Sequence, residues 1–234
     1  MQDFQLALSE AQRLIATGDD GLYAIVWLSL KVSCTSALLA SAIGMPLGAW
    51  LAIARFPGRG VLVAALNALL GLPSVVVGLG VYLLLSRNGP FGSLGLLFSP
   101  SAMVVAQTLL IAPMVASLAR QQLQDSWSEY REQFQSLRVP MPRAIAALLH
   151  DCRFGLLTLL LAAFGRAIAE VGAVMTVGGN IAGATRVMTT AIALETSKGD
   201  LPLALGLGVV LLGLVLTVTL AAQAISTAAQ RHHG

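Results

Sequence analysis

Charge is scarce in this chain. Only 11% of its 234 residues are charged, whereas soluble domains average about 25%. Aromatic residues make up 6%, and the chain has two cysteines and three histidines. A net charge of +3 spread so thinly does not form the basic surface of a nucleic-acid-binding protein, so no nucleic-acid partner is expected. Two cysteines in so long a chain also exclude a disulfide-rich scaffold.

Several catalytic signatures are missing as well. Neither Lys31 nor Lys198 follows the glycines of a phosphate-binding Walker A loop, so we do not expect this chain to hydrolyse ATP. There is no HExxH, GxSxG or pair of intramembrane aspartates, and the histidines lack ligand spacing with cysteines or acidic residues. We therefore expect no catalytic residue, no metal site and no cofactor in this chain. No basic stretch followed by an apolar run opens the sequence, so we expect no cleavable signal peptide.

Apolar residues, in contrast, are abundant, at 56% of the chain with a mean hydropathy of +0.81. A helix needs about 20 apolar residues to cross the lipid bilayer. Five stretches are long enough: about 22–54, 60–86, 101–120, 154–178 and 201–228. We expect an all-α membrane protein with one transmembrane domain over residues 21–230, which includes a cytoplasmic loop over 121–153. An extracytoplasmic amphipathic helix is predicted over residues 1–20.

Basic residues set the orientation of these spans, because cytoplasmic loops carry an excess of Lys and Arg. If the loop between the third and fourth spans is cytoplasmic, eight arginines lie inside and four basic residues lie outside. The inner set is Arg55, Arg59, Arg120, Arg131, Arg138, Arg143, Arg153 and Arg231, and the outer set is Arg13, Arg87, Arg186 and Lys198. This orientation places the N-terminus outside and the C-terminus in the cytoplasm.

The central cytoplasmic loop has a helical pattern of its own. Ser126 and Glu129 fit a capping box, which predicts a helix that begins at Ser126. Four bulky side chains recur on one face of this helix: Trp127, Tyr130, Phe134 and Leu137. Such a face suits docking into a groove on a partner protein. Alternatively, the aromatic rings pack back on the ends of their own spans, and both interpretations stay open.

This loop resembles the coupling loop of importer-type ABC transporter permeases, whose motif reads Glu-Ala-Ala, three residues, then Gly. The best register places Glu132, Gln133 and Phe134 on the triplet and Arg138 on the glycine, and only the glutamate agrees. The resemblance implies that residues coupling the spans to an ATPase lie in this loop. The candidates are Ser126, Trp127, Glu129, Tyr130, Glu132, Phe134, Leu137 and Arg138.

A second resemblance is closer. Residues 165–180 read GRAIAEVGAVMTVGGN and residues 185–195 read TRVMTTAIALE. Together with LPSVVVG at 72–78 and YLLLSRNGP at 82–90, they are similar to the permease subunits of tungstate ABC importers, within the wider molybdate, tungstate and sulfate group. The similarity extends over about residues 22–225.

The resemblance implies a type I ABC importer transmembrane domain with about five spans, in the cytoplasmic membrane of a prokaryote. Two copies would line the pathway, and two separate ATPase subunits would bind ATP and magnesium on the cytoplasmic side. An extracytoplasmic binding protein would deliver the anion, and alternating access would carry it across. Because the binding protein is expected to select the anion, molybdate and sulfate remain alternatives to tungstate.

Arg166 and Glu170 lie one helical turn apart inside the predicted fourth span. Each charge costs at least about 2.5–3.5 kcal/mol at the bilayer centre, so we expect the two to face the bundle and neutralise each other. The pair either supports the gate or steers an oxyanion, or it only orients the span. Further candidates for the pathway, each of which also suits an ordinary loop role, are Thr176, Gly178, Gly179, Asn180, Thr185 and Arg186.

Two other classes of function stay open. A membrane enzyme would use Arg166 and Glu170 as an acid and a base, and the purified chain alone would be active. An ATP-independent membrane scaffold would copurify with no ATPase.

Overall fold

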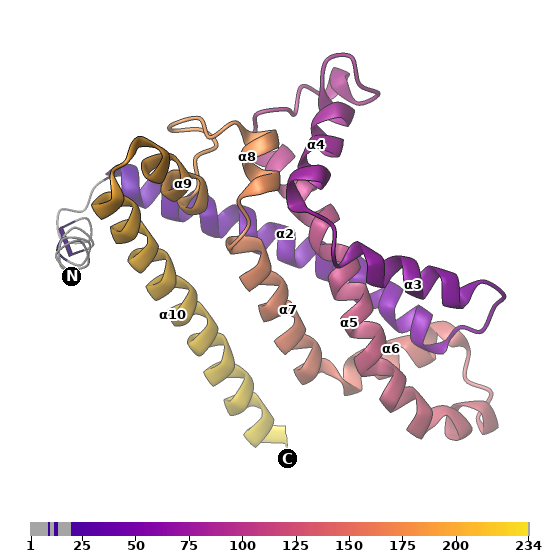
Figure 1. Ribbon diagram of the computed structural model, residues 1–234. Helices are drawn as coiled ribbons and strands as arrows, with labels where there is room; N and C mark the ends of the chain where they lie inside the picture. The colour runs from indigo at the N-terminus through magenta and orange to yellow at the C-terminus, as the bar shows by residue number, and fades with distance from the viewer. Residues whose placement is uncertain (1–8, 10–11, 14–19, 234) are drawn as a thin grey trace.

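The computed structural model describes residues 9, 12–13 and 20–233, and every regular element in this part of the chain is helical. The amphipathic helix predicted over residues 1–20 lies almost entirely outside the described residues. The elements, shown in Figure 1, are α2 (Asp20–Ile53), α3 (Arg59–Leu69), α4 (Ser74–Leu85), η1 (Gly92–Leu94), α5 (Pro100–Ser136), α6 (Met141–Asp151), α7 (Arg153–Ile168), α8 (Gly172–Gly178), α9 (Met188–Lys198) and α10 (Leu201–His233).

The long apolar helices confirm an all-α membrane protein. Three helices, α2, α5 and α10, are long and apolar enough to cross a membrane. Two bent pairs raise the number of candidate spans to five if each pair counts as one: α3 with α4, bent by 101°, and α6 with α7, bent by 77°. The fold class therefore agrees with the transmembrane domain of an ABC permease.

The centre of the fold is the long contact between α2 and α5. A Cβ atom at Gly48 of α2 would lie 2.5 Å from the carbonyl oxygen of Ala116 in α5, so only glycine allows this backbone approach. Around the crossing, α7 and α6 add apolar side chains that exclude solvent. This core includes Leu51, Ile111, Val115, Leu123, Leu148 and Phe164.

Two predicted spans are not single straight helices. The stretch over 60–86 divides into α3 and α4, and Pro73 stands at the N-cap of α4. Proline lacks an amide hydrogen and disfavours the helical conformation in the residue before it, so the helix breaks here. The stretch over 154–178 divides into α7 and α8. Figure 1 shows that these breaks bring α4 and α8 next to each other.

The prediction that a helix begins at Ser126 is wrong. Instead, α5 starts at Pro100, where the hydroxyl of Ser99 accepts a hydrogen bond from the Ala102 amide at 3.4 Å, and it continues without a break to Ser136. Residues 119–125 read ARQQLQD and contain neither glycine nor proline. Because most of them are good helix formers, nothing ends the helix at the predicted boundary of the third span.

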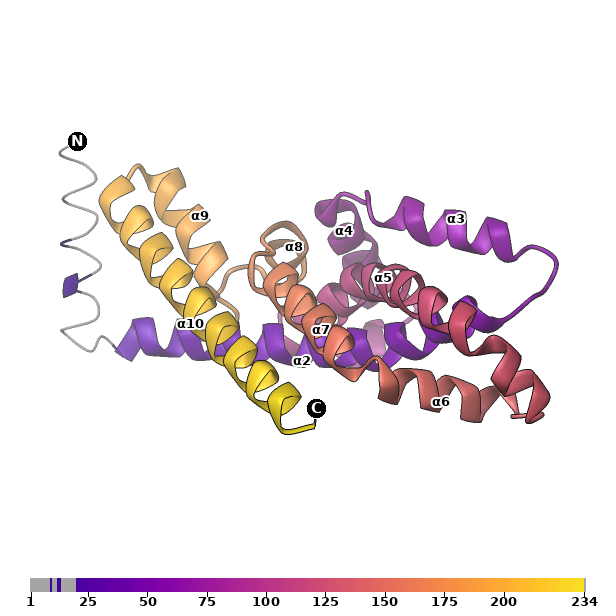
Figure 2. The same ribbon diagram turned by 90° about the horizontal axis from the view of Figure 1, so that it is seen from below.

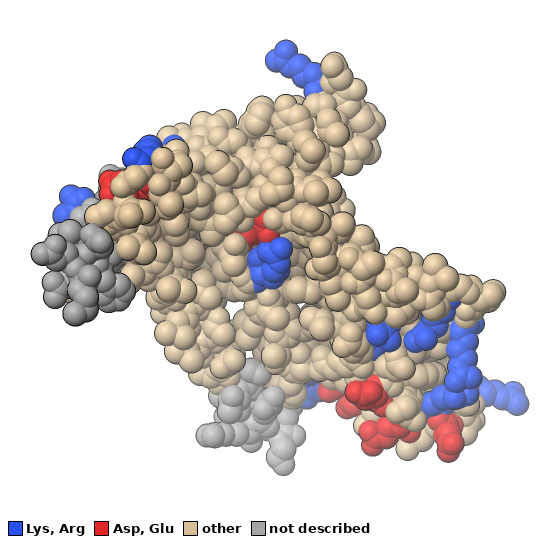
Figure 3. All heavy atoms as spheres, in the orientation of Figure 1, with Lys and Arg blue, Asp and Glu red and all other residues tan. Residues whose placement is uncertain are grey.

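One end of the molecule carries most of the charge. Figure 3 shows basic and acidic side chains gathered around the C-terminal end of α5, α6 and the α2–α3 connection, while most of the remaining face is uncharged. Figure 2 shows that α3 and α6 lie along different sides of α5 at this end. At the other end, α9 and α10 form a helical hairpin. The sequence pattern did not predict α9.

Candidate functional site

An ion pair lies at the break between α7 and α8. Arg166 Nη1 is 2.5 Å from Glu170 Oε2, and the two side chains are 40% and 2% exposed, respectively. The guanidinium lines a hollow of about 200 Å³ whose other walls are apolar: Leu69, Leu70, Leu110, Met114 and Leu118. In Figure 3 an isolated basic and acidic cluster lies on the uncharged face near this break. The pair is thus accessible on its arginine side only.

Glu170 makes further hydrogen bonds that join four helices. Its Oε1 accepts from the Ala173 amide of α8 at 3.1 Å, and the hydroxyl of Ser74, at the start of α4, also donates to its carboxylate. Thr189 Oγ1, from α9, donates to the carbonyl oxygen of Glu170 at 2.8 Å. These residues and Arg166 form the Glu170 network, which connects α7, α8, α4 and α9. Removing one partner of a buried charge costs about 3–5 kcal/mol, so the network is expected to hold these helices firmly.

Beside this network, α4 and α8 touch backbone to backbone. A Cβ atom at Gly78 would lie 2.7 Å from Ala173 Cα. A Cβ atom at Gly172 would lie 2.7 Å from Val75 Cγ2 and 2.8 Å from Ser74 Oγ. Real Cβ atoms are not found this close to other atoms. The close approach of α4 and α8 therefore depends on glycine at both positions.

The loop after α8 is closed by its own side chains. Thr185 is fully buried; its Oγ1 donates to the Gly178 carbonyl at 2.6 Å and accepts from the Ile181 amide at 3.0 Å. Arg186 Nε donates to Asn180 Oδ1 at 3.3 Å. Asn180 and Gly179 both have positive φ, at 51° and 72°. The hydrogen-bonding groups of Thr185 thus bind the protein itself, whereas Asn180 and Arg186 are half-buried and can still reach solvent.

Thr176 and Gly178 also have local partners. Thr176 Oγ1 donates to the Gly172 carbonyl one turn earlier at 2.8 Å. Gly178, buried at the end of α8, faces Met103 of α5, whose Sδ would lie 3.0 Å from an added Cβ. The structure therefore brings the predicted pathway residues together around α8, and each has a structural role there.

A small polar cavity of about 10 Å³ lies behind Glu170. Gln107 of α5 contributes to it; its Nε2 donates to the Ala167 carbonyl at 2.9 Å, while its buried Oε1 has no partner among the described residues. Ser29 and Ser33 of α2 also line this cavity. The centre of the bundle is thus polar where α2, α5 and α7 meet, beside Glu170, the one acidic residue that is buried among those the structure describes.

The predicted coupling residues lie at the opposite end of the fold. The rings of Trp127 and Phe134 stack with centroids 5.8 Å apart, and Tyr130 meets Phe134 edge-on at 6.3 Å. All three pack against the core beside α6, and the Asp151 carboxylate at the end of α6 raises the pKa of the Tyr130 hydroxyl. The aromatic rings therefore pack on their own protein. Leu137 instead remains 74% exposed.

Ser126 and the acidic residues of this segment have separate surroundings. Ser126 Oγ contacts Cys152 Sγ at 3.1 Å, which links α5 to the α6–α7 bend. Glu129 and Glu132 are exposed. The segment thus offers two carboxylates and Leu137 to a partner.

Arg138 occupies a backbone conformation that favours glycine. Its φ is 50°, in the left-handed region. The Arg138 amide donates to the Gln135 carbonyl at 3.1 Å, and the Val139 amide donates to the Phe134 carbonyl at 2.9 Å. These two bonds form a Schellman motif that ends α5, in which glycine is the usual residue at the position of Arg138. The coupling-loop register that aligned Arg138 with a glycine therefore has a backbone explanation.

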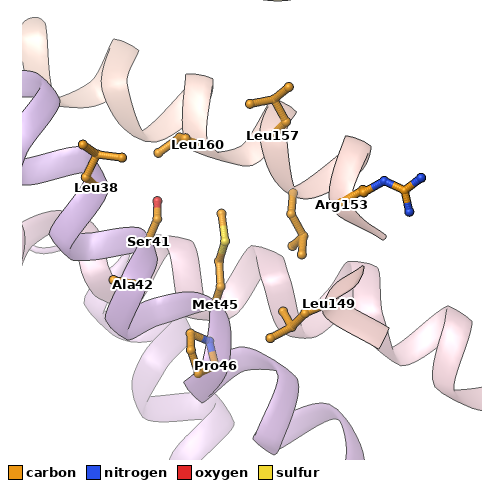
Figure 4. A pocket seen from close by; sticks show the side chains of 10 residues that line it. Leu38, Ser41, Ala42, Met45, Pro46, Leu149, Arg153, Leu157 and Leu160 are labelled. Carbon is orange, nitrogen blue, oxygen red and sulfur yellow. The ribbon is translucent and has the colours of Figure 1, made fainter. Parts of the chain in front are cut away.

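Another hollow lies away from both sites. It has about 500 Å³ and lies between α2, α6 and α7. Figure 4 shows it lined almost entirely by apolar side chains such as Leu38, Met45 and Leu157, while the guanidinium of Arg153 points away from them. With the guanidinium directed away, the hydroxyl of Ser41 is the polar side-chain group that this lining presents.

The chain is similar over most of its length to permease proteins of anion transporters. It is 40% identical to the tungstate uptake system permease protein of Peptoclostridium acidaminophilum, over 86% of this chain and 89% of that protein. It is 39% identical to a probable anion ABC transporter permease protein of Haloferax volcanii, over 84% and 87%. A sulfate transport system permease protein of Synechocystis is 30% identical, over 93% and 81%. No family model matches the chain.

These identities decide the family. The chain is an anion ABC transporter permease. The resemblance inferred from the sequence is thereby confirmed, as is the membrane-spanning, multi-pass character of the protein.

Sequence reasoning missed two residues of the permease that contact the central network. Ser74 follows Pro73, and a hydroxyl directly after a helix-breaking proline was the available signal. Gln107 is a bulky amide within the predicted third span, which is free of charge over residues 101–119. A polar side chain inside a span is a reason to look for a partner. Neither signal indicated that Glu170 lies nearby, because that contact depends on the packing of helices distant in sequence.

Proposed function

We propose that this chain is the channel-forming permease subunit of an ATP-driven importer for tungstate or a related tetrahedral oxyanion. The similarity to tungstate and other anion permeases supports the substrate class. The Glu170 network is the structural observation that carries the transport mechanism. It joins α4 and α8, each of which is one part of a broken span, into one unit that is linked to α7 and α9.

Alternating access requires rigid units that change their relative positions. In this proposal α4, α8 and the α9 N-terminus form one unit around Glu170, and the cytoplasmic ends of α5, α6 and α7 form another. The α6–α7 bend of 77° lies between the coupling segment and the Glu170 network. Movement of α6 by an ATPase would therefore be passed along α7 to Arg166 and Glu170.

Neutralisation of Arg166 by Glu170 is consistent with a pathway that an anion must also leave. A cation without a counter-ion in the pathway would bind a divalent anion tightly, and a pathway must release what it binds. Because Arg166 is half-exposed in its hollow and paired on its other side, it offers a weak site for a passing anion. Selection between anions is then a property of the binding protein.

In the proposed assembly two copies of the chain line the pathway, with the N-terminus outside and the C-terminus in the cytoplasm. Two ATPase subunits, which hold ATP and magnesium, dock on the segment around Leu137, where the exposed Leu137, Glu129 and Glu132 offer an apolar contact and two carboxylates. An extracytoplasmic binding protein delivers the oxyanion to the opposite end. The sulfate and molybdate permease proteins at 30% and 26% identity keep those two anions as alternative substrates.

Reconstitution tests this function. Proteoliposomes that contain the permease, its cognate ATPase and its binding protein are expected to take up tungstate only when ATP is present, and omission of the binding protein should abolish uptake. Excess molybdate or sulfate in the same assay reports the anion preference. ATPase activity that depends on neither the binding protein nor the oxyanion would contradict the proposal. Activity of the purified chain alone would favour a membrane enzyme, and failure to bind the ATPase would favour a scaffold.

A further inference from the structure

Three arginines converge on one small cavity at the predicted cytoplasmic end. Arg55 and Arg59, from the α2–α3 connection and the start of α3, face Arg131 of α5 across a cavity of about 230 Å³. No acidic residue lines it. The remaining lining residues of this arginine pocket are Ala52, Ile53, Ala54, Gln124, Trp127 and Ser128.

The arginine pocket has no counter-ion within the described part of the chain. Arg55 and Arg131 form no ion pair or hydrogen bond there, and Arg59 uses its Nε to donate to the Leu51 carbonyl at 2.8 Å. One turn before Gln124, Arg120 adds a fourth positive charge; it donates to Gln124 Oε1 at 2.7 Å. Like charges held this close repel one another, so an anion in the cavity would stabilise the arrangement.

The position of the pocket points to the membrane surface. Trp50 and Phe56 stack with ring centroids 5.1 Å apart at the end of α2, next to Arg55. Aromatic residues concentrate where a membrane protein crosses from the lipid core to the headgroups. Basic pockets at this depth on the cytoplasmic side are suited to lipid headgroups.

We propose that the arginine pocket binds a tetrahedral anionic group of the phosphate type, supplied by the headgroup of an anionic phospholipid. Guanidinium groups bind phosphate through paired hydrogen bonds, and Gln124, whose Oε1 accepts from Arg120, has an amide nitrogen left to donate from the same wall. The cavity of about 230 Å³ has room for a phosphate-sized group. The site is additional to the proposed transport function and depends on it only for the leaflet, which the proposed orientation makes the cytoplasmic one.

Lipid binding to the purified full-length permease tests the site. Native mass spectrometry would compare added dioleoylphosphatidylglycerol with dioleoylphosphatidylcholine. The wild type should retain the anionic lipid preferentially. A double variant Arg55→Gln/Arg131→Gln should bind it about 25-fold more weakly, since each basic residue near the surface contributes about five-fold. The matched control Arg87→Gln/Arg143→Gln removes the same charge outside the pocket and should bind like the wild type.

A second arm distinguishes a lipid from a free oxyanion. Sodium phosphate and sodium tungstate at millimolar concentration should displace little phosphatidylglycerol. If instead they bind with the same dependence on Arg55 and Arg131 while the lipid does not, the site stands and its ligand is a free anion. Equal lipid binding by the wild type, the double variant and the control, with no binding of free anions, would overturn the proposal.

Folding and transport are separate controls. Arg55 is exposed and has no hydrogen bond within the described part of the chain, so Arg55→Gln alone should keep the wild-type melting temperature and still weaken lipid binding about five-fold. The assay needs neither ATPase nor binding protein, so its outcome is independent of whether the transport proposal holds.

Discussion

Arg166 and Glu170 form an ion pair at 2.5 Å in which only the glutamate is buried. Removal of the arginine and removal of the glutamate should therefore affect the stability of the protein differently. Without Arg166 the carboxylate remains as an uncompensated buried charge beside Gln107 and Ala173. Without the carboxylate, the arginine still reaches the neighbouring hollow.

We expect Arg166→Gln to destabilise the permease by about 3–5 kcal/mol, the cost of leaving a buried charge unpaired. Glu170→Gln should cost clearly less, because the amide oxygen can still accept from the Ala173 amide. The measurement is thermal unfolding of each variant in the same detergent. Arg166→Gln/Glu170→Gln serves as the control and should be more stable than Arg166→Gln alone. Equal losses in the two single variants would contradict the asymmetry.

A second prediction concerns the contact between α4 and α8. Gly78→Ala should destabilise the protein by about 1–3 kcal/mol, because its new methyl group would lie 2.7 Å from Ala173 Cα and the backbone must shift. Gly80, two residues later in the same helix, has nothing within 4 Å of an added Cβ. Gly80→Ala is therefore the matched control and should be neutral or slightly stabilising. Unfolding temperatures of both variants, with uptake in proteoliposomes, test whether this contact matters for stability and for transport. If Gly78→Ala left the unfolding temperature unchanged, α4 and α8 would be able to separate at little cost.

The class of fold could be predicted from hydropathy alone, because α2, α5 and α10 are apolar over the length of a span. The bends could not. Pro73 marks a break in the sequence, but its 101° angle depends on how α3 packs along α5 and α4 along α8. Likewise, the capping box at Ser126 is real as a pattern, yet the helix formers before it carry α5 straight through.

The candidate site was also predictable only in part, because some of its contacts are local in sequence and others depend on tertiary packing. Arg166 and Glu170 are one turn apart, so local geometry is enough to pair them. Ser74 and Thr189 reach Glu170 only through tertiary packing, which no local pattern reports. The aromatic face of the coupling segment was visible, but whether Phe134 met a partner or its own α6 depended on the position of α6.

A third prediction concerns the end of α5. A residue with a side chain in the left-handed conformation costs about 1–2 kcal/mol, and glycine avoids this cost while losing some chain entropy. Arg138→Gly should therefore stabilise the permease by about 0.5–1 kcal/mol, measured as a raised melting temperature. Gln133→Gly, in the helical last turn of α5, should lower stability by about 0.5–1 kcal/mol. If both glycines destabilise equally, the Schellman motif is not what ends α5.

The last prediction separates docking from folding in the coupling segment. Leu137 is exposed, whereas Phe134 stacks on Trp127 and packs beside α6. Leu137→Asp should weaken association with the cognate ATPase at least about 30-fold, as expected for an apolar anchor, with no change in melting temperature. Phe134→Asp should lower the melting temperature as well, because it places a charge in an aromatic cluster. Leu137→Met keeps the apolar contact and should retain the ATPase on copurification. Wild-type ATPase binding by Leu137→Asp would place the docking surface elsewhere. The exposed Glu129, Glu132 and Arg138 would then be the next residues to test, since they are charged side chains of this segment that a partner can reach.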